Sequence, residues 1–298
     1  MIKKTTKIKK TKGEQTFSVF NWILLGVIGI VCLYPMIYVL FASLSDSNAL
    51  MAHEGLLLKP LGFNISSYKK VIENPMILIG YKNTLFVLIV GLLVNMVMTT
   101  LGAYFLARKN VYFKNLIMGL ILFTMYFSGG LIPTYMIVKN LGLDDSLLAL
   151  ILPTAVSTYN MIIMRTGFAG IPETLHEAAT VDGANELLIM TRIYLPLAKA
   201  TIAVIVLYYA VTHWNSWFNA AIYLNSREKF PLQLVLREIL ISNDLNTMSD
   251  ATSASDVESI AMSIKYATIM VATVPILIVY PFVQKYFVGG IMIGSVKG

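Results

Sequence analysis

The sequence predicts an all-α integral membrane protein with six transmembrane helices. Of its 298 residues, 57% are apolar and only 13% are charged, and the mean hydropathy is +0.71. Ordinary soluble domains contain about 45–50% apolar and about 25% charged residues. Six apolar stretches are long enough to cross a hydrocarbon core of about 30 Å. These observations predict a bundle of membrane-spanning helices.

The six predicted spans have no acidic or basic residue in their interiors. They lie near 18–44, 83–107, 115–138, 147–165, 200–223 and 266–286. We therefore expect one transmembrane domain over 18–287, preceded by a basic tail over 1–17 and followed by a tail over 288–298. Several prolines and glycines interrupt these runs and should kink the helices or free backbone carbonyls. They are Gly129, Gly130, Pro133, Pro153, Pro275 and Pro281.

The distribution of charge predicts the orientation. Lysine and arginine are retained on the cytoplasmic side of membrane proteins. With the lysine-rich N-terminus inside, most of the 23 basic residues lie in cytoplasmic segments and most of the 16 acidic residues lie outside. An even number of spans then places both termini in the cytoplasm. On the outer side, FPLQLVLREILI at 230–241 has helical apolar spacing and predicts an external amphipathic helix, either a lid on the membrane or a partner contact.

Several functional classes lack their usual residues. The chain has no phosphate-binding GxxxxGK[ST] loop, no HExxH and no GxSxG, so neither ATP hydrolysis nor a familiar enzyme activity is expected of it. Its three histidines are scattered and Cys32 is its one cysteine, so no metal site is predicted. The net charge of +7 is explained by membrane orientation, and nucleic-acid binding is not expected.

One polar loop stands out between the fourth and fifth spans. Residues 166–197 contain EAATVDGANELLIMTRIYLP, which predicts a helix, a turn and a second helix on the cytoplasmic side. Pro172 suits a first helical turn, Thr174 and Glu177 fit a capping box, and Gly183 fits the left-handed position that ends a helix. Either the first helix is a knob that a partner grips, or the loop is a connector lying on the membrane.

The same residues carry a family resemblance. The pattern EAA, three residues, Gly, nine residues and I-x-LP resembles the EAA motif of ABC importer permeases with every fixed position filled. The resemblance implies a type I importer fold in which 173–183 is a coupling helix that docks on a cytoplasmic ATPase. The residues expected to couple to that ATPase are Glu177, Ala178, Ala179, Asp182, Gly183, Ile193, Leu195 and Pro196.

Other stretches resemble the carbohydrate-uptake permeases of the maltose type, and within these the lipoprotein-polysaccharide and aldouronate oligosaccharide permeases. They include YPMIYVLFASLSD, SGGLIPTYMIVKNLGL, HWNSWFNAAIYL and QKYFVGGIMIGSVKG. The resemblance implies a second homologous permease, two ATPase subunits that bind ATP and Mg, an extracellular sugar-binding lipoprotein and a Gram-positive plasma membrane. No cofactor is expected in this chain.

A sugar path needs aromatic faces beside neutral hydrogen-bonding groups. The fifth span offers this mixture, and the third and fourth add weaker candidates. The candidate path residues are Tyr126, Tyr159, Asn160, His213, Trp214, Asn215, Trp217 and Asn219. Each of them could instead be an interfacial anchor or pack within the bundle.

The function predicted is therefore that of a carbohydrate permease subunit moving an oligosaccharide or modified sugar. Two alternatives stay open from the sequence. One is an ABC permease for another solute, such as a peptide or amino acid. The other is a membrane anchor or signalling subunit that transports nothing.

Overall fold

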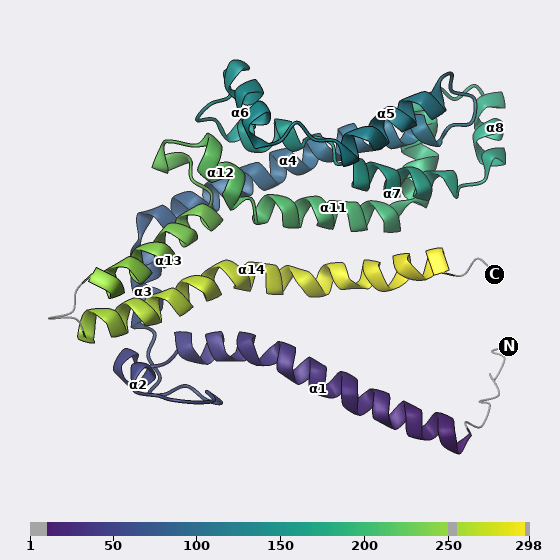
Figure 1. Cartoon of the computed structure of the whole chain (residues 1–298). Helices are drawn as coiled ribbons and strands as arrows, with labels where there is room; N and C mark the ends of the chain where they lie inside the picture. Colours follow the sequence, from purple (N-terminus) through teal and green to yellow (C-terminus); the bar gives the residue numbers. More distant parts are fainter. Residues whose placement is uncertain (1–10, 250–254, 296–298) are drawn as a thin grey trace. The chain divides into compact units, whose positions relative to one another are not determined.

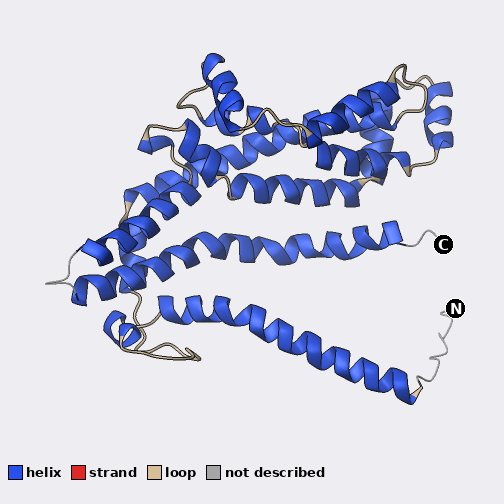
Figure 2. Cartoon of the chain, viewed as in Figure 1, coloured by secondary structure: helices blue, strands red, loops and turns tan. Residues whose placement is uncertain are grey.

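The computed structural model describes residues 11–249 and 255–295, and this part of the chain consists of helices and loops (Figure 2). Its one β-type feature is an isolated antiparallel bridge between Ser45 and Phe63. The elements, labelled in Figure 1, are α1 (Lys12–Ser43), α2 (Ser47–Met51), α3 (Ser66–Glu73), α4 (Pro75–Ala107), α5 (Lys114–Tyr126), α6 (Leu131–Asn140), η1 (Leu147–Leu150), η2 (Leu152–Thr154), α7 (Thr158–Ala169), α8 (Glu173–Val181), α9 (Glu186–Ile189), the π-helix η3 (Met190–Tyr194), α10 (Leu195–Leu197), α11 (Lys199–Trp214), α12 (Trp217–Tyr223), η4 (Arg227–Lys229), α13 (Leu232–Ser249) and α14 (Ser255–Ser295).

The chain divides into two compact units. The first comprises 1–71 and 245–270, and the second comprises 72–244 and 271–298. The predicted transmembrane domain over 18–287 includes parts of both. The predicted tail boundaries at 17 and 288 fall within α1 and α14, while 1–10 and 296–298 lie outside the described residues.

The first unit contains the N-terminal helix and the segment that follows it. A capping box starts α1: the Thr11 hydroxyl accepts from the Glu14 N–H, and the Glu14 carboxylate accepts from the Thr11 N–H at 2.7 Å. At the last residue of the helix, the Ser43 hydroxyl pairs with the Tyr68 hydroxyl at 2.7 Å. The Leu57 N–H donates to the Tyr34 hydroxyl, which fixes the intervening loop against α1.

The second unit is built around α4, which packs against α7 and α11 (Figure 1). Small residues permit close approach at both interfaces of α7. Met161 Sδ lies 2.8 Å from where a Cβ on Gly102 would be, and Thr201 Oγ1 lies 2.8 Å from the equivalent position on Gly167. Without a hydrophobic force between helices in lipid, such close packing is a main source of association.

Three of the six predicted spans are broken rather than continuous. Helices α1 and α4, together with 262–281 of α14, are long and apolar enough to cross a membrane. The other candidates are bent pairs: α5 with α6 at 112°, 147–154 with α7 at 50°, and 186–197 with α11 at 86°. Six spans result when each bent pair counts as one. The interruption of 115–138 expected at Gly129 and Gly130 is therefore confirmed, whereas the prediction of one helix over 200–223 was wrong, because α11 ends at Trp214.

Two of these breaks have a local cause, and the fifth span also ends earlier than predicted. Between α5 and α6, Gly130 has a φ of +86°, which is favourable for glycine and strained for other residues. In the next span, Pro153 lies in the 3₁₀ turn η2 ahead of α7. The predicted fifth span stops at Trp214, because α11 ends there and α12 begins as a separate helix at Trp217.

Freed backbone carbonyls at the break before α7 are satisfied by a side chain from α4. Asn95 Nδ2 donates to the carbonyls of Thr154 and Ala155 at 2.6 and 2.9 Å. Its Oδ1 accepts from His213 Nε2 of α11 at 2.6 Å. Asn95 therefore joins three elements, and irregular backbone within a membrane protein needs this kind of internal partner.

The predicted amphipathic helix at 230–241 corresponds to the start of α13, and it packs on α4. Leu232, Val235 and Leu236 are buried. The Leu232 N–H donates to the Thr84 hydroxyl at 2.8 Å, and the Leu232 Cα lies 2.9 Å from where a Cβ on Gly80 would be. This face of the helix is therefore part of the core of its unit.

A second set of hydrogen bonds, made by Asp145, connects the loop before η1 to the loop after α12. Asp145, with a left-handed φ of 52°, accepts from the N–H groups of Asn225 and Ser226 at 2.9 Å. Its carboxylate also accepts from the Ser226 hydroxyl and from Lys229 Nζ, both at 2.6 Å. These bonds hold the pKa of Asp145 well below its usual range, the bond from Lys229 contributing most.

Candidate functional site

The polar loop between the fourth and fifth spans forms the helix–turn–helix that its sequence predicts. After α8, Gly183 has a φ of +83°, and the Gly183 N–H donates to the Thr180 carbonyl. The Ala184 N–H donates to the Ala179 carbonyl, which completes a Schellman motif. The Asn185 side chain then accepts from the Leu188 N–H at 2.8 Å and starts α9. The predicted role of Gly183 as the helix terminator is confirmed.

The start of α8 differs from the prediction. The helix begins at Glu173, its N-cap is Pro172, and no side chain caps it. The expected capping box of Thr174 and Glu177 is therefore wrong, because both residues already lie within the helix. This leaves the Glu177 side chain exposed rather than bonded to its own first turn.

The C-terminal part of the motif forms the bend into the fifth span. Pro196 cannot donate a backbone hydrogen bond, and the chain ahead of it widens into the π-helix Met190–Tyr194. Ile193 and Leu195 pack partly buried against the apolar core, while Pro196 is exposed. These three residues set the direction of the chain and lie apart from the exposed face of α8.

That exposed face is available to a partner. Glu177, Ala178 and Asp182 are exposed, and Val181 is 87% exposed. Ala179 faces a groove of about 380 Å³ between α8 and α9, lined by Ala179, Asp182, Ala184, Leu188, Ile189, Arg192 and Ile193. An exposed helix with small side chains beside a groove has the shape that a protein partner can engage.

A polar cluster that the sequence did not predict lies behind α8. His176 is the one buried side chain of this helix, and its Nδ1 lies 2.9 Å from Nη2 of Arg108 at the end of α4. Arg108 also pairs with Glu173 at 3.1 Å. Glu186 of α9 lies 3.2 Å from His176 Nε2 and accepts from the Tyr104 hydroxyl. The cluster connects α4, α8 and α9.

Two features of the sequence indicate this cluster only in retrospect. Glu173 and His176 are three residues apart and share a helix face, and Arg108 follows directly after an apolar span. Arg108 counted only as a cytoplasmic charge, since its partners lie 65 and 68 residues away.

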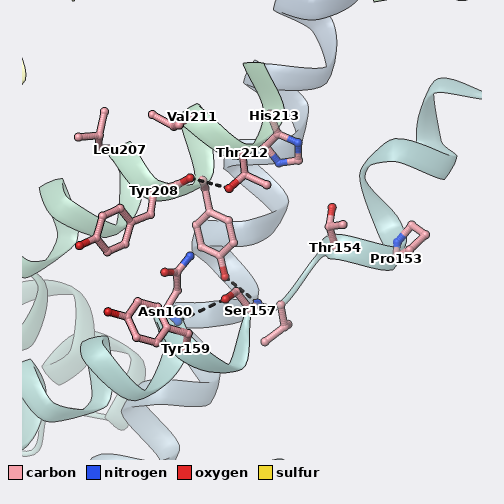
Figure 3. Close-up of a pocket in the computed structure, with 12 residues that line it drawn as sticks. Pro153, Thr154, Ser157, Tyr159, Asn160, Leu207, Tyr208, Val211, Thr212 and His213 are labelled. Atoms are coloured by element: carbon pink, nitrogen blue, oxygen red, sulfur yellow. Dashed lines mark hydrogen bonds between the residues drawn. The ribbon is translucent and has the colours of Figure 1, made fainter. Parts of the chain in front are cut away.

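A second candidate site is a cavity of about 710 Å³ between α7 and α11 (Figure 3). Tyr159 and Tyr208 contribute their rings to it, with centroids 6.3 Å apart. Ser157, Asn160 and Thr212 add neutral polar groups. The full lining is Pro153, Thr154, Val156, Ser157, Tyr159, Asn160, Leu207, Tyr208, Tyr209, Val211, Thr212 and His213, none of which is an acid, a lysine or an arginine.

The cavity includes three of the eight candidate path residues. Tyr159, Asn160 and His213 line it, and His213 is also held by Asn95. The other five are absent from its lining: Tyr126, Trp214, Asn215, Trp217 and Asn219.

Four of those five residues have contacts or exposure elsewhere. Trp214 packs edge-on to Tyr81, and the indole Nε1 is buried with no hydrogen-bond partner in the described part of the chain. The Arg237 guanidinium lies 3.6 Å above the Trp217 ring. Asn215 bonds to its own helix, and Tyr126 is 77% exposed. Sequence reasoning did not identify Tyr208 and Thr212, which lie on the face of α11 that Tyr159 adjoins (Figure 3).

Comparisons with known proteins identify the family. Residues 17–292 match the family described as "Binding-protein-dependent transport system inner membrane component". Protein LplC of Bacillus subtilis is 41% identical over 288 residues, covering 97% of each chain. The polygalacturonan/rhamnogalacturonan transport system permease protein YtcP of the same bacterium is 40% identical, covering 96% of this chain and 99% of that one.

A solved structure agrees with the sequence relatives. A chain in the crystal structure of a bacterial ABC transporter involved in the import of the acidic polysaccharide alginate superposes with a TM-score of 0.85 at 30% identity. The match covers 94% of this chain and all of that one. The fold is therefore that of a type I ABC importer permease, as predicted. The chain belongs to the family of binding-protein-dependent transport system inner membrane components, as the non-catalytic permease subunit of an ABC transporter.

Proposed function

We propose that this permease imports a carbohydrate, either an oligosaccharide or a modified sugar, by alternating access. The observation that carries the proposal is the cavity between α7 and α11, where tyrosine rings lie beside a serine, an asparagine and a threonine (Figure 3). Sugars present apolar ring faces and hydroxyl groups, which these side chains match. The names of YtcP and of the alginate transporter, both concerned with polysaccharides, support the same substrate class.

The exposed face of α8 would dock on a cytoplasmic ATPase subunit. Glu177, Ala178 and Asp182 would contact the ATPase, while Gly183 and the bend formed by Ile193, Leu195 and Pro196 would hold α8 in position. The complete importer would contain a second homologous permease, two ATPase subunits binding ATP and Mg, and an extracellular sugar-binding lipoprotein. Both termini would face the cytoplasm of a Gram-positive cell, with the six helices in contact with lipid.

Uptake into vesicles carrying the complete complex tests the substrate class. Labelled oligogalacturonides, neutral oligosaccharides and short peptides are compared in the presence of the cognate binding protein and ATP. Carbohydrate uptake is expected. Uptake of peptide alone would show that the permease transports another solute. No uptake of any of these compounds would favour the anchor or signalling role.

Paired variants test the cavity itself. Tyr159→Ala and Asn160→Ala should lower uptake without reducing assembly, because each removes a group that faces the cavity. A lost aromatic contact is worth about 0.5–1.5 kcal/mol. Tyr126→Ala is the matched control, since Tyr126 is exposed and does not line the cavity. Equal uptake by Tyr159→Ala and the control would show that the cavity is not part of the transport path.

A lysine in place of Glu177 tests the docking surface. The side chain is exposed and makes no cap, so Glu177→Lys should fold normally. It should reduce copurification of the ATPase or the ATPase rate stimulated by binding protein. A variant that binds and stimulates normally would support the connector interpretation of the loop.

A further inference from the structure

We propose that Arg108, His176 and Glu186 form the link through which movement of α8 reaches α4 and the cavity. The inference rests on the proposed docking of α8 on the ATPase. It assigns a positioning role to three residues outside the group predicted to couple, and it identifies α4 as the element that receives the movement.

The donors and acceptors of Arg108, His176 and Glu186 permit one arrangement of protons when the imidazole is neutral. A guanidinium can only donate, so His176 Nδ1 must accept from Arg108 Nη2 at 2.9 Å. The proton of a neutral imidazole then lies on Nε2, which donates to the Glu186 carboxylate at 3.2 Å. The imidazole therefore acts as a bridge between a cation on α4 and an anion on α9, with one nitrogen serving each.

The position of His176 makes α8 depend on this bridge. It is the one buried side chain of the helix, and Ala179 is the residue of α8 that packs, partly buried, against the apolar core. Glu173 adds a bond to Arg108 at 3.1 Å and an ion pair with Lys109 at 3.7 Å. A short helix held by few apolar contacts is oriented chiefly by its polar ones.

The C-terminal end of α4 is bonded to its neighbours, so a displacement of Arg108 would be passed to the helix. Arg165 of α7 donates to the Leu106 carbonyl at 3.1 Å, and Lys114 donates to the Arg108 carbonyl at 2.7 Å. Cations suit the carbonyl end of a helix. The Tyr104 ring lies 5.0 Å from that of Tyr194, edge to face, which joins the same end to the bend in the fifth span.

Further along α4, Asn95 contacts both walls of the cavity. It bonds to Thr154, Ala155 and His213, of which Thr154 and His213 line the cavity. Asn95 lies on α4 and Arg108 is the C-cap residue directly after it, about 20 Å away at 1.5 Å per residue. A rigid helix with specific contacts at both points is a physical route for coupling.

Thiol labelling of the cavity tests the link without requiring the substrate. In a background lacking Cys32, Thr212→Cys places a thiol in the cavity wall. Its labelling rate by a small maleimide is measured in the complete complex, with and without trapping by MgATP and vanadate. Trapping should change the rate by about fivefold or more, the lower end of ordinary allosteric coupling.

Substitutions in the bridge should separate docking from transmission. With His176→Phe, the complex should retain its ATPase subunits but lose the labelling response. His176→Gln keeps one acceptor and one donor and should restore most of the response. His53→Phe is the matched control, because His53 lies in a loop of the other unit. Glu186→Gln, at a side chain that is 63% exposed, gives a partial loss if His176→Phe does not assemble.

Three results would overturn the link: a normal response in His176→Phe, loss of the bound ATPase from both His176→Phe and Glu186→Gln, or no response in the parent complex. Failure of the proposed function gives a different result. A parent complex that responds to trapping yet takes up no carbohydrate would overturn the substrate proposal and leave the link intact.

Discussion

His213 Nε2 lies 2.6 Å from Asn95 Oδ1, and the His213 imidazole occupies the space beside Gly91 that a side chain on α4 would fill. The pair connects two helices of the bundle, while the same asparagine satisfies two carbonyls at the break before α7. His213 was predicted as a path residue because the fifth span combines aromatic and neutral hydrogen-bonding side chains. Its buried bond to Asn95 gives it a structural role at the edge of the cavity.

This packing predicts a strong effect at Gly91. A Cβ there would lie 2.5 Å from His213 Nε2 and 2.7 Å from Cε1. Gly91→Ala should therefore destabilise the complex by about 1–3 kcal/mol, the usual cost of overpacking. The thermal midpoint of the purified complex measures this. Gly119→Ala is the control, since nothing lies within 4 Å of that position. Equal midpoints for the two variants would contradict the packing.

The sequence predicted the class of fold well because hydropathy sums over a whole segment. It could not predict the angles of the bends, since apolar content does not report the direction of a helix axis. At Ser128–Gly130 the glycines were recognised as interruptions, yet the 112° turn depends on the left-handed φ of Gly130. The end of α11 at Trp214 had only a weak signal, because Asn215 and Ser216 favour turns but are followed at once by further aromatic residues.

The outline of the coupling motif was predictable from local sequence rules. Gly183 and Pro196 act locally, so their effects can be deduced from neighbours in the sequence. The bridge from Arg108 through His176 to Glu186 depends on two helices meeting in space, and no local rule indicates that pairing. Neither Tyr208 nor Thr212 has a sequence signal for the cavity, because the break before α7 determines which face of α11 is open.

Thiol labelling tests the predicted orientation in the membrane. Single cysteines at Asn48, Glu228 and Thr180, in a background lacking Cys32, all lie at exposed positions. An impermeant reagent applied to intact cells should label the first two and spare Thr180. Permeabilised cells, in which Thr180 should react, provide the control. External labelling of Thr180 would reverse the assigned topology.

The hydrogen bonds to Asp145 should make the stability of this loop contact depend on pH. Its pKa is lower in the folded protein than in the unfolded chain, where Asp titrates near 3.9. Stabilisation by the carboxylate is therefore present above that pH and is lost as the pH falls through the folded pKa. Hydrogen-exchange protection of the amides of Asn225 and Ser226 should decrease at acid pH. Asp145→Asn should show weak protection that does not change with pH, and the same acid response in both proteins would exclude this carboxylate as the cause.

The end of α8 gives the sharpest test of the coupling motif, because Gly183 is required for its backbone conformation alone. Its φ is +83°, and nothing lies within 4 Å of where its Cβ would be. Any loss from a substitution therefore comes from backbone strain, which costs roughly 1–2 kcal/mol for most residues and less for asparagine. Gly183→Val should weaken ATPase association or uncouple hydrolysis from uptake, and Gly183→Asn should retain most of both. Gly170→Ala is the matched control, since Gly170 ends α7 with a φ of −77°. Copurification of the ATPase and the rate stimulated by binding protein measure the effect in each variant. If valine and asparagine behave alike, the left-handed turn does not position α8, and the direction of the second helix must be set by the bend at Pro196.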